Sequence, residues 1–494
     1  MFGKKSFKSR QIWQVDNYRS YTDLFRGFFS IGWIFKIIFI IGCVVLVFYV
    51  WWFFLRQAQW AIGIITKWTV KMVSNNVGND MKRDEFGNVN VMVIWYGGAN
   101  HAWWYLADSI MVVSWNPKLW AITMISIPRD LYVYDAEQRM HGRINEVFSR
   151  GVSRKHEFDT WAIVMASMLE DIVWFEIPYY ALVDFQWFQW IIDTLWWIII
   201  DVPERIYDQT YPNGRWWYLT FTVNPWLNKF DGKTALMYAR SRHSSSDFAR
   251  SLRQQQIIKA VMDKISNNGI WNVGKIKQLY SEYTEMVRTN ISLKEIIWMV
   301  KNFYDVKNIF SYWFTTECSN YAYKYSYPWC FLYTPDRALF DWASVIIPDG
   351  WTPGNVTFYD YTKNFAFFVA HNQKYLMENP SISIMNGIDK NFARKTVRKA
   401  DGFANQLAVK LKKYAFNVVD TQNFGQAISW NVVYVLGTGN YKDTINTLKY
   451  FLDISEVVTN IGSWEISYSW VDLMLVLWNQ YVEKLAISPF NYYK

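Results

Sequence analysis

Residues 238–254 read Tyr238-Ala-Arg240-Ser-Arg242-His243-Ser-Ser-Ser-Asp247-Phe-Ala-Arg250-Ser-Leu-Arg253-Gln254, with four arginines within fourteen residues. Apolar residues before this stretch and periodic ones after it predict an element, a serine-rich turn and a helix. Asp247 is a good N-cap for that helix, and Arg250 and Gln254 would share one helical face. If the preceding segment is extended, Arg240 and Arg242 also share a face. The stretch favours a polyphosphate-binding site, with a solvated basic helix as the alternative.

Length and composition indicate a globular protein of two or three domains. The chain has 494 residues, of which 52% are hydrophobic and 19% charged, and its net charge is +9. Such a charge suits anionic lipid, phosphorylated substrates or nucleic acid. Because the sequence has no basic block and no nucleic-acid-binding motif, we expect no nucleic acid among its partners.

The tryptophan content is unusual, with 30 Trp against 23 Gly. Many tryptophans occur in pairs or beside turn residues, as at Trp103-Trp104, Trp196-Trp197, Trp216-Trp217, Ser114-Trp115-Asn116-Pro117 and Asn224-Pro225-Trp226. Such turns often need positive φ, which glycine adopts easily and tryptophan does not. We interpret many of these residues as glycine in the living protein, from a bacterial lineage that reads the UGA codon as glycine. A sugar-stacking surface or a membrane belt would not spread Trp through turns along the whole chain.

The N-terminal region predicts a membrane anchor. Residues 1–36 form a basic tail, and residues 37–55 are apolar, uncharged and long enough to span a bilayer. The preceding positive charge predicts a cytoplasmic N-terminus, and the lack of a small-residue cleavage site predicts an uncleaved anchor. A buried core helix is the alternative. The domains that follow would be extracytoplasmic, attached to the cell membrane by a single span.

After a juxtamembrane segment at residues 56–87, strands and helices alternate. This pattern predicts an α/β fold, with an α-β-α sandwich over residues 88–265. Asp108 opens one predicted strand and Arg129 closes the next, at strand ends of the kind where α/β sheets bind ligands. Residues 266–377 read as a helical and mixed connector. A linker at Glu378-Asn379-Pro380 then leads to a small α/β domain over residues 380–482.

The three cysteines fit an exported chain. Cys43 lies inside the predicted span, whereas Cys318 and Cys330 lie in the exported part. An oxidising compartment permits a disulfide between those two, and two free thiols are the alternative. The sequence has no metal-type Cys/His pattern.

Six motifs, in order and behind a single anchor, resemble the catalytic domain of LytR–CpsA–Psr proteins. They are Asp108-Ser-Ile-Met-Val-Val-Ser114, Ser126-Ile-Pro-Arg129-Asp130, Arg143-Ile-Asn145, Asp201-Val-Pro203, Leu236-Met-Tyr-Ala-Arg240-Ser-Arg242 and Asp247-Phe-Ala-Arg250-Ser-Leu-Arg253-Gln254. Residues 380–482 more weakly resemble the LytR C-terminal domain, through Ile384-Met-Asn386-Gly387 and Asp472-Leu-Met-Leu-Val-Leu477. The family usually has glycine where this chain has Trp95, Trp196, Trp197 and Trp226.

The resemblance implies that the protein transfers a glycopolymer from a polyprenyl-pyrophosphate carrier to cell-wall peptidoglycan, with Mg²⁺. Phosphoryl transfer needs positioning and charge neutralisation more than a covalent nucleophile. Pyrophosphatase action on the lipid-linked substrate, or binding of lipid or cell wall without catalysis, stays open as an alternative. The catalytic residues implied are Asp108, Arg129, Arg240 and Arg242; the pyrophosphate ligands are Arg129, Arg240, Arg242, Arg250 and Gln254; the metal ligand is Asp108.

Several of these assignments have a simpler structural alternative. Asp108 could be a strand cap, and Arg129 could be an ion-pair partner of Asp130. Arg253 is the arginine least expected to contact a ligand, because it can instead pack against the sheet.

Two further points concern the metal and the lipid. The family often has a second metal-binding Asp where this chain has Gly97. The coordination is therefore either thinner or completed by His101 or water. The apolar helices between Trp161 and Ile192 either line a tunnel for the lipid tail or form ordinary core.

Peptide mass spectrometry of the native protein tests the recoding interpretation. We expect glycine masses at Trp103, Trp104, Trp196 and Trp197, because paired tryptophans adjoin predicted turns. Tryptophan masses at these four positions would refute it.

Overall fold

The computed structural model describes residues 81–487, apart from 98–104, 136–139, 156, 213–217, 242–246, 269–287, 296–297, 299–305, 307, 317–329, 351–358, 400, 426–428 and 460–469. The predicted basic tail, the predicted anchor at 37–55 and most of the juxtamembrane segment lie outside these residues. Among the residues that are described, no helix is both long and apolar enough to cross a membrane.

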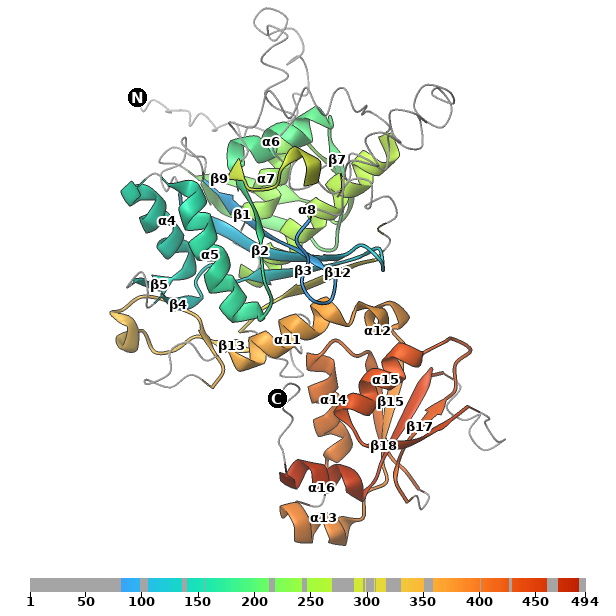
Figure 1. Cartoon of the computed structure of the whole chain (residues 1–494). Helices are drawn as coiled ribbons and strands as arrows, with labels where there is room; N and C mark the ends of the chain where they lie inside the picture. The colour runs from blue at the N-terminus through green and yellow to red at the C-terminus, as the bar shows by residue number, and fades with distance from the viewer. Residues whose placement is uncertain are drawn as a thin grey trace, which may run out of the picture.

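A six-stranded mixed sheet forms the N-terminal half of the described chain (Figure 1). Strand β2 runs antiparallel to both β1 and β3, while β6 is parallel to β1 and β12 is parallel to β3. The strands lie in the order β11 (Arg288–Thr289), β6 (Tyr179–Asp184), β1 (Val89–Tyr96), β2 (Ala107–Asn116), β3 (Ala121–Ile127) and β12 (Asn308–Trp313). The mixed α/β fold agrees with the prediction.

Strand β1 is buried on both faces because its alternate side chains enter two different cores. Met92 and Ile94 belong to one core cluster, whereas Val91 and Val93 belong to another. The first core packs on α4 (Ile144–Lys155), α5 (Phe158–Val173) and α11 (Asp360–His371). The second packs on α6 (Phe185–Thr194), α7 (Gly232–Arg240) and α8 (Asp247–Asn268).

The helices between Trp161 and Ile192 pack into two different cores. Trp161 of α5 lies in the first core, and Ile192 of α6 lies in the second. Because the two helices cover opposite faces of the sheet, they cannot enclose one tunnel between them. Trp161 and Ile192 are core residues, and a lipid tunnel lined by one of these helices alone stays a prediction.

Among the described residues, four two-stranded pairs and one 3-10 helix lie outside the six-stranded sheet. The pairs are β4 (Tyr132–Asp135) with β5 (Met140–Arg143), β7 (Ile198–Val202) with β10 (Trp226–Phe230), β8 (Ile206–Pro212) with β9 (Tyr218–Val223), and β13 (Leu332–Tyr333) with β14 (Ile347–Pro348); the 3-10 helix is η2 (Arg337–Phe340).

The segment before the serine-rich turn is helical as far as Arg240, so the condition of an extended segment is not met at Arg240. Helix α7 begins after Asp231, whose carboxylate accepts a hydrogen bond from the Thr234 amide at 2.7 Å, and ends at Arg240. Helix α8 starts at Asp247 itself, one residue earlier than an N-cap role for Asp247 would give. Arg242 lies outside the described residues.

A five-stranded sheet forms the C-terminal part of the described chain. Adjacent strands in this sheet are parallel, except that β17 and β19 are antiparallel. The strand order is β16 (Val418–Asn423), β15 (Ile382–Asn386), β19 (Leu473–Leu477), β17 (Asn431–Val435) and β18 (Ile454–Val458). The accompanying helices are α12 (Gln373–Glu378), α13 (Lys390–Val397), α14 (Phe403–Lys413), α15 (Lys442–Phe451) and α16 (Asn479–Ile487).

Helices α11 and α12 join the two sheets through a shared core (Figure 1). The Phe368 ring of α11 lies 5.3 Å from the Tyr414 ring and 5.5 Å from the Phe451 ring, between ring centroids. Glu378, within the predicted linker, accepts hydrogen bonds from the amides of Asp443 at 2.9 Å and Thr444 at 2.6 Å. Glu378 therefore caps the start of α15, a helix that accompanies the five-stranded sheet.

Five tryptophans have the positive φ angles that favour glycine. Nine non-glycine residues among those described have positive φ, and the tryptophans among them are Trp120 (52°), Trp174 (64°), Trp196 (70°), Trp226 (81°) and Trp342 (64°). For so bulky a residue this backbone is an outlier. Trp174 ends α5 in the left-handed C-cap conformation, a position usually held by glycine.

Trp115 is different, although it also precedes a turn. It lies in β2 opposite Ile122, is fully buried, and its φ is not positive. Trp95, Trp197 and Trp298 are likewise outside the positive-φ group. Backbone conformation thus separates positions that favour glycine from positions that hold a tryptophan without strain.

Replacing exposed positive-φ tryptophans by glycine should stabilise the fold. Trp226 and Trp342 are 79% and 78% exposed, so their rings lose little burial on removal. We expect Trp226→Gly and Trp342→Gly each to raise the free energy of unfolding by about 1 kcal/mol, through relief of left-handed strain. The matched control Trp115→Gly should instead lower it by about 3–5 kcal/mol, by opening a core cavity. Urea denaturation measures all three, and destabilisation by Trp226→Gly would contradict the strain argument.

Candidate functional site

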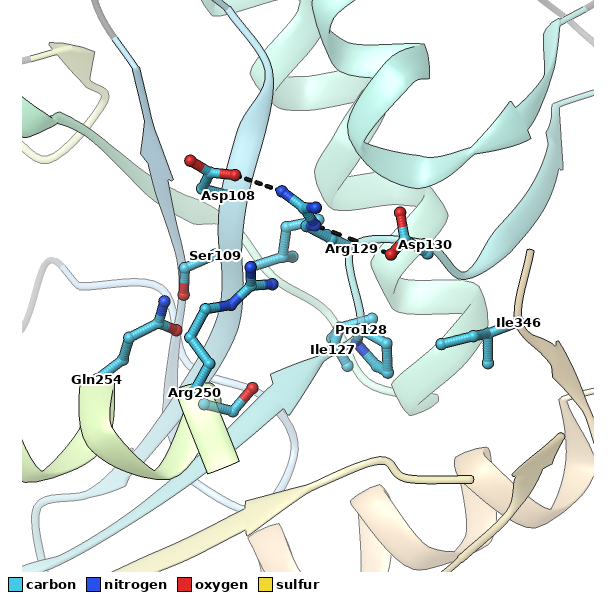
Figure 2. A pocket seen from close by; sticks show the side chains of 11 residues that line it. Asp108, Ser109, Ile127, Pro128, Arg129, Asp130, Arg250, Gln254 and Ile346 are labelled. Atoms are coloured by element: carbon cyan, nitrogen blue, oxygen red, sulfur yellow. Dashed lines mark hydrogen bonds and ion pairs between the residues drawn. The ribbon is translucent and has the colours of Figure 1, made fainter. Parts of the chain in front are cut away.

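The predicted site residues Asp108 and Arg129 meet at one edge of the six-stranded sheet. Asp108 is the second residue of β2, and Arg129 follows the end of β3 by two residues. The antiparallel register pairs Ile110 with Ile127, which brings the start of β2 beside the end of β3. An Arg129 guanidinium nitrogen forms an ion pair with a carboxylate oxygen of Asp108 (Figure 2).

Helices α7 and α8 bring three more predicted residues to this edge. Arg240 is the last residue of α7, and its Nε lies 4.0 Å from Oδ2 of Asp108. Arg250 and Gln254 lie one turn apart on α8 and project into the same pocket (Figure 2). The prediction that these two residues share a helical face is confirmed.

The pocket lining holds two cationic and two anionic groups, and a third guanidinium lies beside it. Arg129 and Arg250 line it, with Arg240 beside Asp108, whereas Asp108 and Asp130 supply the carboxylates. Clustered guanidinium groups repel one another unless anions lie between them. The full lining is Asp108, Ser109, Ile110, Ile127, Pro128, Arg129, Asp130, Arg250, Ser251, Gln254 and Ile346.

Arg129, which lines this pocket, has one buried donor without a hydrogen bond to the described residues. Its side chain is 14% exposed, and its buried Nε makes no hydrogen bond to any described residue. The Asp130 carboxylate is 3.8 Å from that nitrogen, too far for a hydrogen bond. A buried donor without an acceptor is costly. Arg129 is therefore paired mainly with Asp108 and only weakly with Asp130.

The residues around Asp108 offer few oxygen ligands for a bound Mg²⁺. Among the described residues no three His, Cys, Asp or Glu side chains form a metal-binding group. Gly97 is buried at the end of β1 and brings no carboxylate, and His101 lies outside the described residues. Mg²⁺ is often held by one or two carboxylates together with substrate phosphates and water. Asp108 fits such a metal when phosphate oxygens complete its coordination.

One pocket residue, Ile346, was not expected from the sequence. Its amide donates to the Asp130 carbonyl at 2.9 Å, and its carbonyl accepts from the Tyr132 amide at 2.8 Å. These bonds hold the loop that contains Arg129 and Asp130. Ile346 belongs to the segment 330–349, which starts at Cys330, and this cysteine is disulfide-bonded rather than a free thiol. Long-range pairing of this kind leaves no signal in local sequence.

The residues of the arginine-rich stretch at 238–254 do not all reach the pocket. Arg240, Arg250 and Gln254 reach the pocket region, while Arg253 is buried and points at α7. This agrees with the view of Arg253 as the arginine least suited to ligand contact. Arg242 and His243 lie outside the described residues, so their predicted places are not described.

Asp184 is a further acidic residue at this edge of the sheet. It ends β6 opposite Tyr96, the last residue of β1, and its carboxylate accepts a hydrogen bond from the Trp187 amide at 2.8 Å. Burial raises the pKa of Asp184 to about 6, despite the opposing effect of the amides of Trp187 and Gln186. The raised pKa means that folding disfavours the ionised carboxylate.

Together the fold and site define an α/β protein in which guanidinium groups gather beside a carboxylate at one edge of the sheet. Comparison with known sequences places residues 67–327, more than half of the chain, in the LytR_cpsA_psr family. The chain belongs to this family.

Named relatives cover only part of the chain. It is 31% identical over 195 residues to polyisoprenyl-teichoic acid–peptidoglycan teichoic acid transferase TagV of Bacillus subtilis (strain 168), covering 38% of this chain and 46% of the relative. It is 26% identical over 200 residues to the transferase TagU of Bacillus licheniformis, covering 40% and 58%. The chain thus spans about half the length of these relatives. The crystal structure of B. subtilis TagV aligns at 23% identity and a TM-score of 0.41, covering 57% of this chain and 98% of that one.

The pKa of Asp184 predicts a pH-dependent stability. Its folded pKa of about 6 lies above the ordinary value of 3.8, so the native state binds more protons between these pH values. The stability contributed by the protonated carboxyl is complete below about pH 4 and is lost as pH rises through 6. We expect Asp184→Asn, which keeps an oxygen for the Trp187 amide, to flatten this decline in urea denaturation from pH 4 to 7. The exposed Asp401→Asn serves as the charge control, and an unchanged slope in Asp184→Asn would contradict the assignment.

Proposed function

We propose that this protein transfers a glycopolymer from a polyprenyl-pyrophosphate carrier to cell-wall peptidoglycan. The main observation in support is the convergence of Arg129, Arg240, Arg250 and Gln254 around Asp108. Guanidinium groups bind phosphate oxygens with two parallel hydrogen bonds, so this set suits a pyrophosphate better than a single carboxylate. The names of the relatives, polyisoprenyl-teichoic acid–peptidoglycan teichoic acid transferases, support the same reaction class.

The residues suit a displacement at phosphorus. A hydroxyl oxygen of the acceptor attacks the phosphorus bonded to the glycopolymer, forming a phosphodiester. The bond from that phosphorus to the bridging oxygen breaks, and polyprenyl phosphate leaves with the electron pair. The hydroxyl proton passes to solvent. Arg129, Arg240 and Arg250, with Arg242 as a fourth proposed ligand, offset the negative charge of the phosphates, and Gln254 donates a further hydrogen bond.

We include Mg²⁺ in the proposal, with Asp108 as its protein ligand. When bound, the ion would neutralise charge on the phosphate oxygens. The carboxylate faces the phosphate-binding arginines, so it is placed to share a cation with substrate oxygens. The side chain also orients Arg129 through its ion pair.

The cellular setting is part of the proposal. An anchor at residues 37–55 would hold the N-terminus in the cytoplasm and the catalytic domain at 88–265, within an α-β-α sandwich, outside the cell membrane. The site would then face a membrane that contains the lipid carrier. We further propose that residues 380–482 form a LytR C-terminal domain, for which the five-stranded sheet supplies the framework.

We also propose that many tryptophans of this sequence are glycine in the living cell, through reading of UGA as glycine. The support is conformational: Trp196 and Trp226 have φ of 70° and 81°. Both rings are largely exposed, so packing does not compensate for the strained backbone. The usual glycine of the family at these two positions supports the same interpretation.

A transfer assay tests the proposed reaction. Purified full-length protein is given Mg²⁺, peptidoglycan and a polyprenyl-pyrophosphate-linked glycan labelled in the sugar. We expect label to appear in peptidoglycan, and Arg129→Ala or Arg250→Ala to slow transfer on the order of 10²–10³-fold, as for loss of one positioned donor. The exposed Arg394→Ala, on α13, is the matched control.

Other outcomes of this assay would overturn the proposal. Release of phosphate without transfer would indicate a pyrophosphatase. Binding of the lipid-linked glycan without turnover would indicate a non-catalytic lipid- or wall-binding protein.

A further inference from the structure

Arg253 is a buried arginine on α8 that does not line the pocket. Its Nε donates to the Tyr238 carbonyl at 2.9 Å, and a terminal guanidinium nitrogen donates to the Ser241 carbonyl. Both acceptors lie at the C-terminal end of α7, where helical carbonyls lack intrahelical partners. The planar guanidinium fork is well matched to two such oxygens, and its charge is favourable at a helix C-terminus.

A second buried contact holds this end of α7 from the other side. Ser241 is the C-cap of α7, and its hydroxyl donates to Oδ2 of Asp208 at 2.7 Å. Asp208 lies in β8, and its other oxygen accepts from the Thr210 amide at 3.0 Å. Ser241, Asp208 and Arg253 are all at least nine-tenths buried. The backbone on both sides of Arg240 is therefore fixed by groups from α8 and β8.

The Arg240 side chain is also held in place. Its guanidinium carbon lies 4.4 Å from the ring centroid of Phe185, in cation–π contact. The charge of Arg240 also acts on the nearby Tyr211 of β8, where it opposes the rise in the Tyr211 pKa that burial causes. These contacts direct Nε of Arg240 toward Asp108, at 4.0 Å. The position of this group depends on where α7 ends.

Helix α8 thus uses successive side chains for different purposes. Arg250 and Gln254 enter the pocket, whereas Gln255 donates to the Ser126 hydroxyl at 2.9 Å and to the Tyr312 carbonyl at 3.0 Å. Gln255 ties α8 to the ends of β3 and β12. Arg253 ties it to α7. One helix therefore sets the spacing between the groups that line the pocket and Arg240.

We propose that Arg253 is a positioning residue that acts through Arg240. It fixes the end of α7 so that Arg240 faces Asp108 and the pyrophosphate, and it does not itself contact the substrate. This assignment rests on the proposed function, since it presumes that Arg240 binds a pyrophosphate. Under this proposal, three arginines of the stretch are pyrophosphate ligands and Arg253 is a positioning residue.

A double-mutant cycle tests the assignment. Arg253→Lys keeps the charge but loses the fork that reaches two carbonyls, and Arg240→Ala removes the group it is proposed to position. We expect Arg253→Lys to weaken binding of inorganic pyrophosphate, measured by calorimetry, by about tenfold, because small displacements of a positioned group are costly. In the Arg240→Ala background the same change should have no further effect.

Equal losses from Arg253→Lys in both backgrounds would overturn the proposal, because they would reflect a general structural defect. Ser241→Ala offers a second variant if Arg253→Lys fails to fold. It removes the Asp208 hydrogen bond, and its effect on affinity should also disappear in the Arg240→Ala background. Persistence of that effect would count against the proposal. Arg394→Lys is the matched exposed control, with unchanged affinity.

The binding measurement keeps this proposal separate from the proposed function. Pyrophosphate affinity does not require an acceptor or any transfer. Coupling between Arg253 and Arg240 without transfer to peptidoglycan would support the positioning role and reject the transferase. Where transfer occurs, Arg253→Lys should lower kcat by about tenfold at saturating lipid-linked glycan, and the Arg240→Ala background should again remove the effect.

Discussion

Guanidinium groups from three different elements are held within reach of one carboxylate, and this arrangement sets the demands on the rest of the site. Arg129 comes from the end of β3 and Arg240 from the end of α7, and both face Asp108. Arg250 comes from the first turns of α8. Like charges at this spacing repel strongly where water is partly excluded. Asp108 offsets part of that repulsion, and an anionic ligand would offset the rest.

The sequence predicted which residues take part better than it predicted how they are held. Asp108, Arg129, Arg250 and Gln254 were expected at one site because strand ends and an i, i+4 pair have local signatures. Arg240 was expected there too, but its helical backbone was not foreseen, because short segments rich in Ala and Tyr fit helix or strand equally. Local patterns do not say that these residues meet in the fold. The resemblance of six motifs to the family supplied that expectation.

The supports of the site escaped prediction because they are long-range. Ile346 lies more than 200 residues along the chain from Asp130, yet its amide donates to that carbonyl. Ser241 and Asp208 meet only because α7 ends beside β8. Neither periodicity nor spacing in the sequence predicts such pairs, because neither partner carries a local signal of the contact. In the fold they decide where Arg129 and Arg240 point.

The loop that contains Arg129 also shows that the site is not built by the family-matched region alone. Residues 67–327 match the family, whereas Ile346 lies beyond them and lines the pocket. Tyr359, at the start of α11, donates its hydroxyl to the Tyr132 carbonyl at 2.9 Å, next to the bonds made by Ile346. Helix α11 in turn shares its core with the second sheet. A continuous series of contacts therefore connects the edge of the sheet that carries Arg129 to the C-terminal part of the chain.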